Sequence, residues 1–567
     1  MKLKGSFFLE PKLLDVSSIL SRAPLFLGAL IIPLLRTELI FDNFTYIKWF
    51  GVYVVALLAT CGLLSHKNIP VPKLPVWCWC FLGFAVAIFA AHLFCAQTSV
   101  VSFSVVDRIS LIALCFYFFT FFRQQNNGLQ LLFMPTLLAT VATIAWGSYQ
   151  IFVSGIGDDY SASFGNTNMA GQFLGFSIII QSFISPSGKK SKWFEGLRFA
   201  IFFLSISYMT ILMCRSIFLG LIICYPLLFL KKPKRRVFIL TAAILAAILF
   251  GLFVRSHRVQ VFQRAKQFAL YNPTSQQRLN LYKQSLRIIR DHPLGIGPGA
   301  YEFGSIPYAM NTDLPPREDQ IFRSPHNEVL RFSVEDGIPY VLLMTAVIIF
   351  IFASVILPTA RISEDSIFFI AFGIIWLFET LFQFPFENAY PAFLFTVVAG
   401  SALSKNGESD CHFPLIAKAL ATAALIAISF LGSRIIYSKY LEANSGGNMA
   451  GYQRSCDAFA DNWRACLTFA KGKIEQHDWQ SADLLIRSVL NKTPYNFSAI
   501  RIWSVLAFRS KHFDEGCYAE WIYDQIFSEH SGLHGNLLSL CPEESEKLAK
   551  IGMSNLYPKP LPNLFSN

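Results

Sequence analysis

Long apolar runs without a charged residue recur along the first 430 residues of this chain. A bilayer core of about 30 Å takes roughly 17–25 apolar residues in a helix, and scanning at that length predicts about 13 spans. They centre on residues 17–35, 47–65, 75–95, 109–122, 129–153, 169–185, 197–214, 216–230, 237–254, 336–357, 366–383, 389–403 and 414–433. Because lipid offers the backbone no hydrogen-bond partner, open-ended spans must be helical, and the predicted class is all-α. The charged fraction of 15% is also well below that of a typical soluble domain.

Lysine and arginine residues concentrate in alternate segments between the predicted spans, with the densest run at residues 231–236. The positive-inside rule assigns these segments, and the basic N-terminus, to the cytoplasm. Residues 1–22 show no apolar core followed by a small-residue cleavage site, so we expect a retained cytoplasmic segment and not a cleaved signal peptide. Counting 13 spans then puts residues 255–335 and 434–567 on the periplasmic face of a bacterial inner membrane.

The net charge of +12 is a topology signal and does not indicate a nucleic-acid partner. Residues 434–567 hold 14 Lys/Arg and 14 Asp/Glu, so the whole basic excess lies in the membrane part. We therefore predict a membrane domain over residues 1–433, which includes the periplasmic segment 255–335, and a soluble periplasmic domain over residues 434–567.

The predicted soluble domain contains a weak internal repeat. Trp479 aligns with Phe513, and Ala482 with Gly516, at an offset of 34 residues. This period is typical of tetratricopeptide-like helical hairpins. The same region contains four cysteines, Cys456, Cys466, Cys517 and Cys541, which are expected to pair in an oxidising compartment, although the sequence leaves the pairing open.

Polar clusters lie at the predicted outer ends of two spans. The first is Gly165-Asn166-Thr167-Asn168 at the start of a span, where asparagine has the alternative role of capping a helix. The second is Arg215, between two apolar runs that have almost no linker. An arginine there has the alternative role of extending its charge to the membrane interface.

The long outer segment contains the third cluster. Arg278, Tyr282 and Arg290 recur at helical spacing, which predicts an amphipathic helix at the membrane surface. A glycine-rich turn over residues 295–299 follows, but no strand precedes it, so a dinucleotide site is improbable. The segment ends with His326-Asn327-Glu328 and, nine residues after the histidine, Glu335.

The order of these motifs resembles the O-antigen ligase superfamily over roughly residues 160–403. The matching pieces are the GNTN segment, Arg215, the pattern R-x(12)-D-x-P-x-G-x-G-x-G that begins at Arg278, and HNE-x-L-x(4)-E-x-G that begins at His326. Two positions depart from the family pattern: Thr167 stands where proline is usual, and Tyr282 where tryptophan is frequent.

The resemblance implies a glycan donor on undecaprenyl pyrophosphate and a hydroxyl acceptor on the periplasmic face. Guanidinium groups match phosphate oxygens with paired hydrogen bonds, so Arg215 and Arg278 are assigned to the pyrophosphate. An imidazole suits general-base work near neutral pH, so His326 is the candidate base, with Glu335 orienting it or holding the acceptor.

Four further residues, Asn166, Asn168, Asn327 and Tyr282, are expected to contact glycan or acceptor. No Asp/His/Cys cluster with metal-ligand spacing is evident in the sequence, so we expect no cofactor and a metal-independent transfer with inversion.

Three acceptors remain open within this superfamily. A ligase that uses lipid A-core ranks first on breadth of match. A protein O-oligosaccharyltransferase follows, favoured by the repeat-bearing tail and by the segment 384–390, and a polysaccharide polymerase is third. From other classes, a transporter of lipid-linked glycan would place charges at mid-membrane in repeated halves, which the sequence lacks, and a scaffold leaves the arginines unexplained.

Overall fold

The computed structural model describes residues 21–40, 42, 44–65, 72, 75, 101–125, 128–153, 161–184, 192–227, 234–258, 273–309, 322–357, 364–405, 414–460, 462–493, 495–527 and 541. Over these residues the regular structure is helical and contains no β-strand, so the all-α prediction is confirmed.

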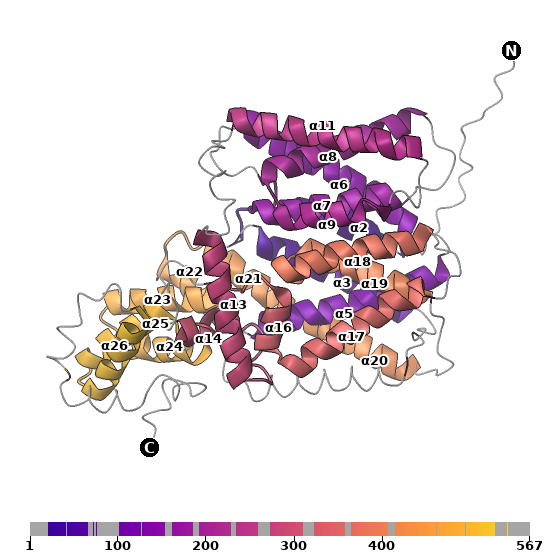
Figure 1. Cartoon of the computed structure of the whole chain (residues 1–567). Helices are drawn as coiled ribbons and strands as arrows, with labels where there is room; N and C mark the ends of the chain where they lie inside the picture. The colour runs from indigo at the N-terminus through magenta and orange to yellow at the C-terminus, as the bar shows by residue number, and fades with distance from the viewer. Residues whose placement is uncertain are drawn as a thin grey trace, which may run out of the picture.

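A bundle of roughly parallel helices forms the larger part of the molecule (Figure 1). Its elements are α2 (Ala23–Ile31) with η1 (Ile32–Leu34), α3 (Thr45–Ser65), α5 (Val101–Gln124), η2 (Gly128–Leu132), α6 (Phe133–Phe152), α7 (Thr167–Phe183), α8 (Lys192–Leu212), α9 (Arg215–Cys224), α11 (Lys234–Arg258), α17 (Ile338–Ile356), α18 (Glu364–Phe382), α19 (Ala389–Ser404) and α20 (Pro414–Ala427).

Six helical segments of the described chain are long and apolar enough to cross a membrane. They are Thr45–Ser65, Gly128–Phe152, Trp193–Leu212, Ile338–Ile356, Asp365–Phe382 and Lys418–Ala443. Four of the expected spans correspond to shorter apolar helices, Ala23–Leu34, Arg215–Cys224, Leu240–Arg255 and Ala389–Ser404. The expected span at 109–122 lies within α5, the one at 169–185 overlaps α7, and the one at 75–95 lies almost wholly outside the described residues. By length and composition, six of the expected spans are thus supported as membrane-crossing helices among the described residues.

Helices α7 and α19 form the centre of the bundle, since almost every residue of both is buried. The close packing of α19 against α5 depends on small residues. A Cβ atom at Gly400 would lie 2.8 Å from the backbone nitrogen of Phe119. Small residues of this kind let helix backbones approach within a membrane bundle.

The helix that begins at Pro414 continues into the C-terminal tail, residues 434–567. After α20, a π-helical turn, η4 (Ile428–Gly432), leads without a break into α21 (Ser433–Ala443). The expected domain boundary between residues 433 and 434 therefore falls inside one helical rod.

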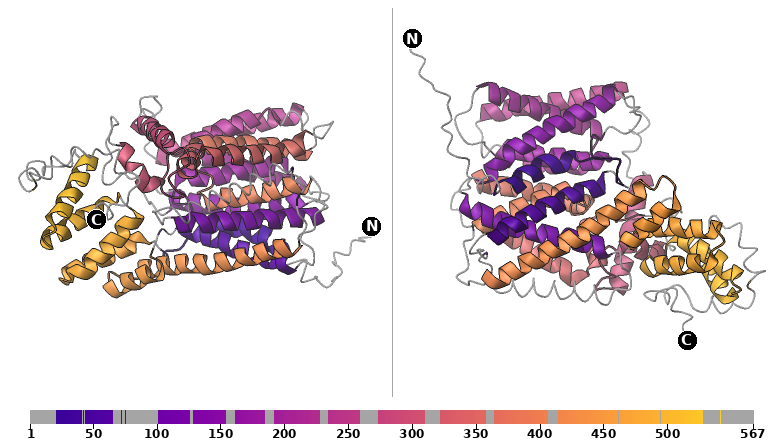
Figure 2. Two further views of the ribbon diagram at one scale, coloured as in Figure 1. Left: turned by 90° about the horizontal axis from the view of Figure 1, so that it is seen from below. Right: turned by 180° about the vertical axis from the view of Figure 1, so that it is seen from behind.

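Shorter helices lie across one end of the bundle (Figures 1 and 2). They are α13 (Pro273–Asp291), α14 (Tyr301–Gly304), α15 (Ile306–Ala309) and α16 (Glu328–Glu335). The amphipathic helix predicted around Arg278 is α13, which buries Leu281 and Ile288 and exposes Leu286.

The tail lies beside these helices and has its own core. Its elements are α22 (Met449–Ala458), α23 (Trp463–Glu475), α24 (Trp479–Lys492), α25 (Phe497–Arg509) and α26 (Phe513–Phe527), each packed on the next. His477 and Lys511, 34 residues apart, both take a left-handed backbone with φ 62° at the turns before α24 and α26. The tail is thus a series of helical hairpins, and its assignment as tetratricopeptide-like remains a prediction.

Two disulfides join the four tail cysteines, Cys456 to Cys466 and Cys517 to Cys541. The first connects α22 to α23, and the second ties residue 541 to α26. The pairing that the sequence left open is therefore between cysteines close along the chain.

Candidate functional site

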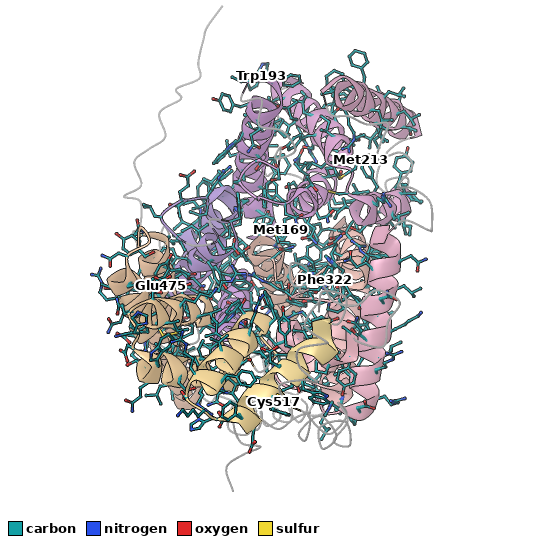
Figure 3. All side chains as sticks on the ribbon, turned by 90° about the vertical axis from the view of Figure 1, so that its left-hand side faces the viewer. Met169, Trp193, Met213, Phe322, Glu475 and Cys517 are labelled. Carbon is teal, nitrogen blue, oxygen red and sulfur yellow. A yellow bond between two sulfur atoms is a disulfide. The ribbon has the colours of Figure 1, made fainter. Side chains whose placement is uncertain are left out.

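The first two predicted motifs meet at the end of the bundle beside which the tail lies. Asn166 caps α7, because its side-chain oxygen accepts a hydrogen bond of 2.8 Å from the backbone nitrogen of Asn168. The thiol of Cys214 donates to the carbonyl oxygen of Thr167 over 2.9 Å. The residue before Arg215 therefore contacts the GNTN segment directly. Figure 3 views this side of the molecule and labels Met169 and Met213, which adjoin the two motifs.

A sharp turn sets the position of Arg215. Met213 takes a left-handed backbone with φ 58°, and Cys214 is extended, so α8 ends and α9 begins within two residues. Arg215 is the first residue of α9. The side chain of Arg215 therefore extends from the first turn of α9, before the apolar run that follows.

Arg278 on α13 lies near Arg215, although 63 residues separate them. Burial lowers the pKa of the Arg278 guanidinium, and the positive charge of Arg215 lowers it further, while Tyr282 and Glu379 act in the opposite direction. Two guanidinium groups near each other repel, and a bound anion would relieve that repulsion. The two predicted pyrophosphate ligands are thus brought into one neighbourhood.

His326 joins the same neighbourhood. Its backbone is left-handed, with φ 55°, and the hydroxyl of Tyr282 donates to its carbonyl oxygen over 3.5 Å. The imidazole packs on the ring of Phe384, with 5.3 Å between ring centroids. Its buried Nδ1 has no hydrogen-bond partner among the described residues. Burial and the charge of Arg278 lower the pKa of His326 to about 4, so the ring is neutral at neutral pH.

Asn327 has a structural role in this chain. Its side-chain oxygen accepts from the backbone nitrogen of Leu330 at 2.9 Å, which caps α16. Its amide nitrogen donates to the carbonyl oxygen of Leu381 at 3.0 Å, which ties α16 to the end of α18. These two bonds hold the adjacent His326 in place.

Glu335 lies at the opposite end of α16 from His326. That helix has eight residues and is about 12 Å long. The Glu335 carboxylate pairs with Arg331 at 3.3 Å. The glycine-rich turn covers this end, since the backbone nitrogen of Gly297 donates to the carbonyl oxygen of Glu335 at 2.9 Å. The structure therefore does not bring Glu335 to the imidazole, and the glycine turn serves to close a helix end.

Arg331 forms the centre of a buried ionic cluster that the sequence did not single out. It pairs with Glu328 at 2.6 Å and with Glu387 at 3.3 Å, in addition to Glu335. Burial raises the pKa of the Glu387 and Glu335 carboxyls, and the Arg331 guanidinium opposes that effect. Fifty-six residues separate Arg331 from Glu387, so no local pattern marks the pair.

Glu379 near the end of α18 is a second residue that the sequence analysis missed. Its carboxylate is fully buried and accepts a hydrogen bond of 2.5 Å from the side chain of Gln172 on α7. Asn388 donates to the same glutamine. The Glu379 charge attracts Arg278. The sequence does contain a signal for Glu379: a single carboxylate inside a predicted membrane span usually has a functional role.

Among the residues that the structure describes, no group of three or more His, Cys, Asp or Glu side chains comes together in a way that could hold a metal ion.

The fold and site define a membrane protein that gathers two arginines, a histidine and a buried glutamate at the end of its bundle beside which the tail lies. The sequence model of the O-antigen ligase family matches residues 200–345, which include Arg215, Arg278 and His326. Residues 200–345 thus match the O-antigen ligase family, whose members are glycan ligases and transferases, and the predicted resemblance is confirmed over that part of the chain. No curated protein matches the chain.

Proposed function

We propose that this protein transfers a glycan from undecaprenyl pyrophosphate to a hydroxyl group at the periplasmic face of the inner membrane, with lipid A-core as the acceptor. The observation that carries the proposal is that Arg215, Arg278 and His326 lie near one another at one end of the bundle. The first two supply positive charge, and the third supplies a neutral imidazole with a free nitrogen.

The arginines bind and activate the donor. A pyrophosphate diester carries negative charge that grows as its bond to the sugar breaks, and preorganised cations are most effective where charge develops. Guanidinium groups also orient the phosphates through paired hydrogen bonds. Because Arg215 and Arg278 supply this charge, the transfer needs no metal ion in our proposal. The charge of Glu379 attracts Arg278 from the bundle side.

His326 acts as the general base. The acceptor oxygen attacks the anomeric carbon, its proton passes to Nδ1 of His326, and the bond from that carbon to the pyrophosphate oxygen breaks. Undecaprenyl pyrophosphate leaves, and a single displacement of this kind inverts the anomeric centre. The donor's negative charge near Arg278 raises the pKa of His326 above its value in the free protein, which makes the imidazole a better base when substrate is bound.

The polar residues around this centre position the substrates. Asn168, at the start of α7, and Tyr282, one turn from Arg278, are proposed to contact the glycan. Asn166 and Asn327 were expected to do the same, and their capping bonds assign them first to holding the two helix starts.

Two disulfides support the periplasmic orientation. Cys456–Cys466 and Cys517–Cys541 form and persist in oxidising compartments, and the periplasm is one. A periplasmic tail places the site on the same face of the membrane, because α14 and α15 pack into the tail core through Phe303 and Ile306.

The test is acceptor-dependent release of undecaprenyl pyrophosphate by purified protein supplied with lipid-linked glycan. Wild-type protein should release it only when a hydroxyl acceptor is present. His326→Ala should abolish turnover while donor binding persists, and Arg278→Lys should weaken donor binding because an ammonium lacks the planar fork. Turnover by His326→Ala at the wild-type rate would refute the base assignment.

A protein acceptor is the second candidate function. It is favoured by the tail, which packs its helical hairpins against the segment that carries the site. Lipid A-core, a pilin-like protein and free glycan should be assayed in parallel with one donor, since these correspond to ligase, protein O-oligosaccharyltransferase and polymerase activity.

A further inference from the structure

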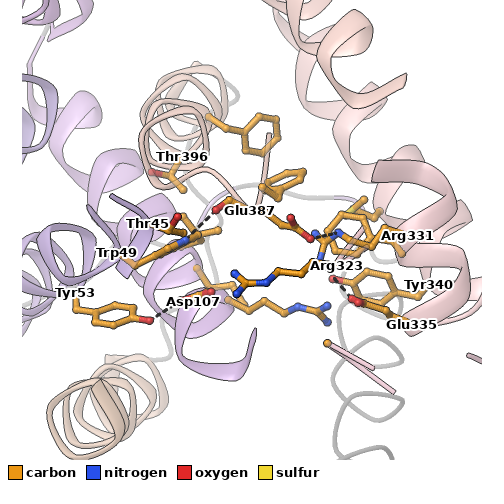
Figure 4. A pocket seen from close by; sticks show the side chains of 18 of the residues that line it. Thr45, Trp49, Tyr53, Asp107, Arg323, Arg331, Glu335, Tyr340, Glu387 and Thr396 are labelled. Carbon is orange, nitrogen blue, oxygen red and sulfur yellow. Dashed lines mark hydrogen bonds and ion pairs between the residues drawn. The ribbon is translucent and has the colours of Figure 1, made fainter. Parts of the chain in front are cut away.

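A cavity of about 460 Å³ lies beside α16, which contributes Arg331, Phe332 and Glu335 to its wall (Figure 4). Neither Arg215 nor Arg278 lines it. Four membrane helices, α3, α5, α17 and α19, form most of its wall, and the tail contributes Trp463 at the start of α23. In Figure 4, Arg323 and Arg331 reach into the cavity opposite Trp49 and Tyr53.

One end of the cavity is apolar and lies within the membrane bundle. Its lining side chains come from α5 and α17, and include Leu111, Ile112, Leu343, Val347, Ile348 and Ile351. The span that contains α17 has the highest mean hydropathy of the six, at 2.5. Ile112 is 57% exposed, so the wall of the cavity reaches the outer surface of the bundle. This end suits an alkyl chain that enters from the lipid.

The other end combines aromatic rings with hydrogen-bonding groups. Trp49 is held by a bond of 2.9 Å from its indole nitrogen to the carbonyl oxygen of Glu387. Trp463 packs edge-on against Phe303, with 5.5 Å between ring centroids. Glu302 lies nearby on the same wall. Flat rings with a few fixed polar groups are typical of sites that orient a ligand with both apolar and polar faces.

The charges at this end face opposite charges, and this includes Lys439, which pairs with Glu442 at 3.1 Å, and Arg464, whose charge acts on Glu302. Arg331 faces Glu328, Glu335 and Glu387. Arg108 forms two bonds with Asp336, at 2.7 and 2.8 Å. Arg323 lies within 4 Å of both Asp42 and Glu302. Because these cations already face carboxylates, the cavity favours an uncharged, hydroxyl-rich head over a pyrophosphate.

Two short segments connect the cavity to the imidazole. Arg323 lines the cavity three residues before His326. On the other side, Phe384 packs on the His326 ring, and Phe386 two residues later lines the cavity. Only these short segments therefore separate the polar end of the cavity from the His326 imidazole.

We propose that this cavity is the acceptor subsite and that it takes a saccharide anchored on an alkyl or acyl chain. The chain lies along α5 and α17, and the sugar head lies among Trp49, Trp463 and Glu387. One head hydroxyl faces His326 while the donor's pyrophosphate occupies the arginine side. The inference rests on the proposed function for the identity of the reaction, and the cavity itself is tested by binding.

The test uses a dodecyl glycoside that carries a photoreactive diazirine on its chain, added to the full-length protein in lipid nanodiscs. Irradiation and peptide mapping should place the label on α5 and α17. Ile348→Trp fills the cavity. Ile349→Trp is the matched control, because Ile349 lies about 100° further round the helix, does not line the cavity and is 61% exposed. We expect labelling at the cavity to fall about ten-fold in Ile348→Trp and to persist in Ile349→Trp, since steric exclusion from an apolar pocket has effects of this order.

Turnover with methyl, octyl and dodecyl forms of one sugar then links the cavity to the reaction. Wild-type kcat/KM should rise with chain length, Ile348→Trp should remove that rise, and Ile349→Trp should preserve it. An equal loss for all three acceptors would assign the cavity to the donor's chain and overturn the inference, as would labelling spread evenly over the lipid-facing surface. A preference for pilin-like protein, with no labelling in the cavity, would also overturn it. Labelling in the cavity without transfer to any acceptor would refute the proposed function and leave the saccharide site standing.

Discussion

The low pKa of His326 predicts that the enzyme keeps its activity in acid. With a pKa of about 4, roughly nine tenths of the imidazole is neutral at pH 5, against about one thirtieth for an ordinary histidine with a pKa of 6.5. The ratio kcat/KM for the donor follows the protonation state of the free protein. We therefore expect kcat/KM to change little between pH 7.5 and pH 5, and to decline with a midpoint near pH 4. An ordinary histidine would lose about thirty-fold over the same interval.

The assay is initial-rate release of undecaprenyl pyrophosphate at fixed ionic strength, with His512→Gln, an exposed tail histidine, as the control variant. A midpoint near pH 6.5 would refute the reasoning. The pH profile of kcat reports the donor-bound protein. Its acid midpoint should lie at higher pH than that of kcat/KM, because the donor's negative charge offsets the positive charge of Arg278.

The same shift predicts a loss of stability in acid. The unfolded chain takes up a proton at His326 below pH 6.5, whereas the folded protein does so only near pH 4, so folding stability falls as the pH drops through this window. The pKa difference corresponds to about 3 kcal/mol. Thermal melts of wild type and His326→Gln should diverge between pH 7 and pH 4, with the variant less sensitive. Parallel curves would contradict the buried, cation-facing setting of the ring.

Three further outcomes follow from the packing. Glu379→Gln should lower kcat/KM for the donor by about ten-fold or more, because it removes the negative charge that attracts Arg278. The melting temperature should change little, and kinetics and thermal melts measured together check both outcomes. Gly400→Leu should prevent folding or cost more than about 2 kcal/mol, while Gly373→Ala, where the nearest atoms lie 3.9 Å away, should be neutral, as expression and detergent stability will show. Replacing Cys456 and Cys466 together by alanine should destabilise the tail by about 3 kcal/mol, measured by limited proteolysis of the full chain, because a ten-residue separation closes a short loop.

Helices that have a local sequence signal were predicted, whereas contacts between residues far apart in the chain were not. Apolar runs located α3, α6 and α17 to within a few residues, because a helix that crosses lipid must be uninterrupted. Other expected spans correspond to helices shorter than the hydropathy pattern indicates, since α9 is only ten residues long and α19 is a buried central helix of sixteen. Neither length nor burial can be read from hydropathy alone.

The candidate site shows the same division. Motif order alone predicted Arg215, Arg278 and His326 as site residues, and the structure brings them together. Spacing did not reveal that Glu335 lies at the far end of α16. The contact between Gln172 and Glu379 spans 207 residues and leaves no trace in local sequence.

The unbroken helical rod from Pro414 to Ala443 fixes the orientation of the tail relative to the helix bundle. Each residue of an α-helix turns it by 100° and advances it by 1.5 Å, so one residue gained or lost within that rod would swing Trp463 away from the cavity wall. The π-helical turn at Ile428–Gly432 already contains one such offset. The number of residues in this connection, and not only their polarity, therefore sets the rotational phase in which the tail meets the bundle.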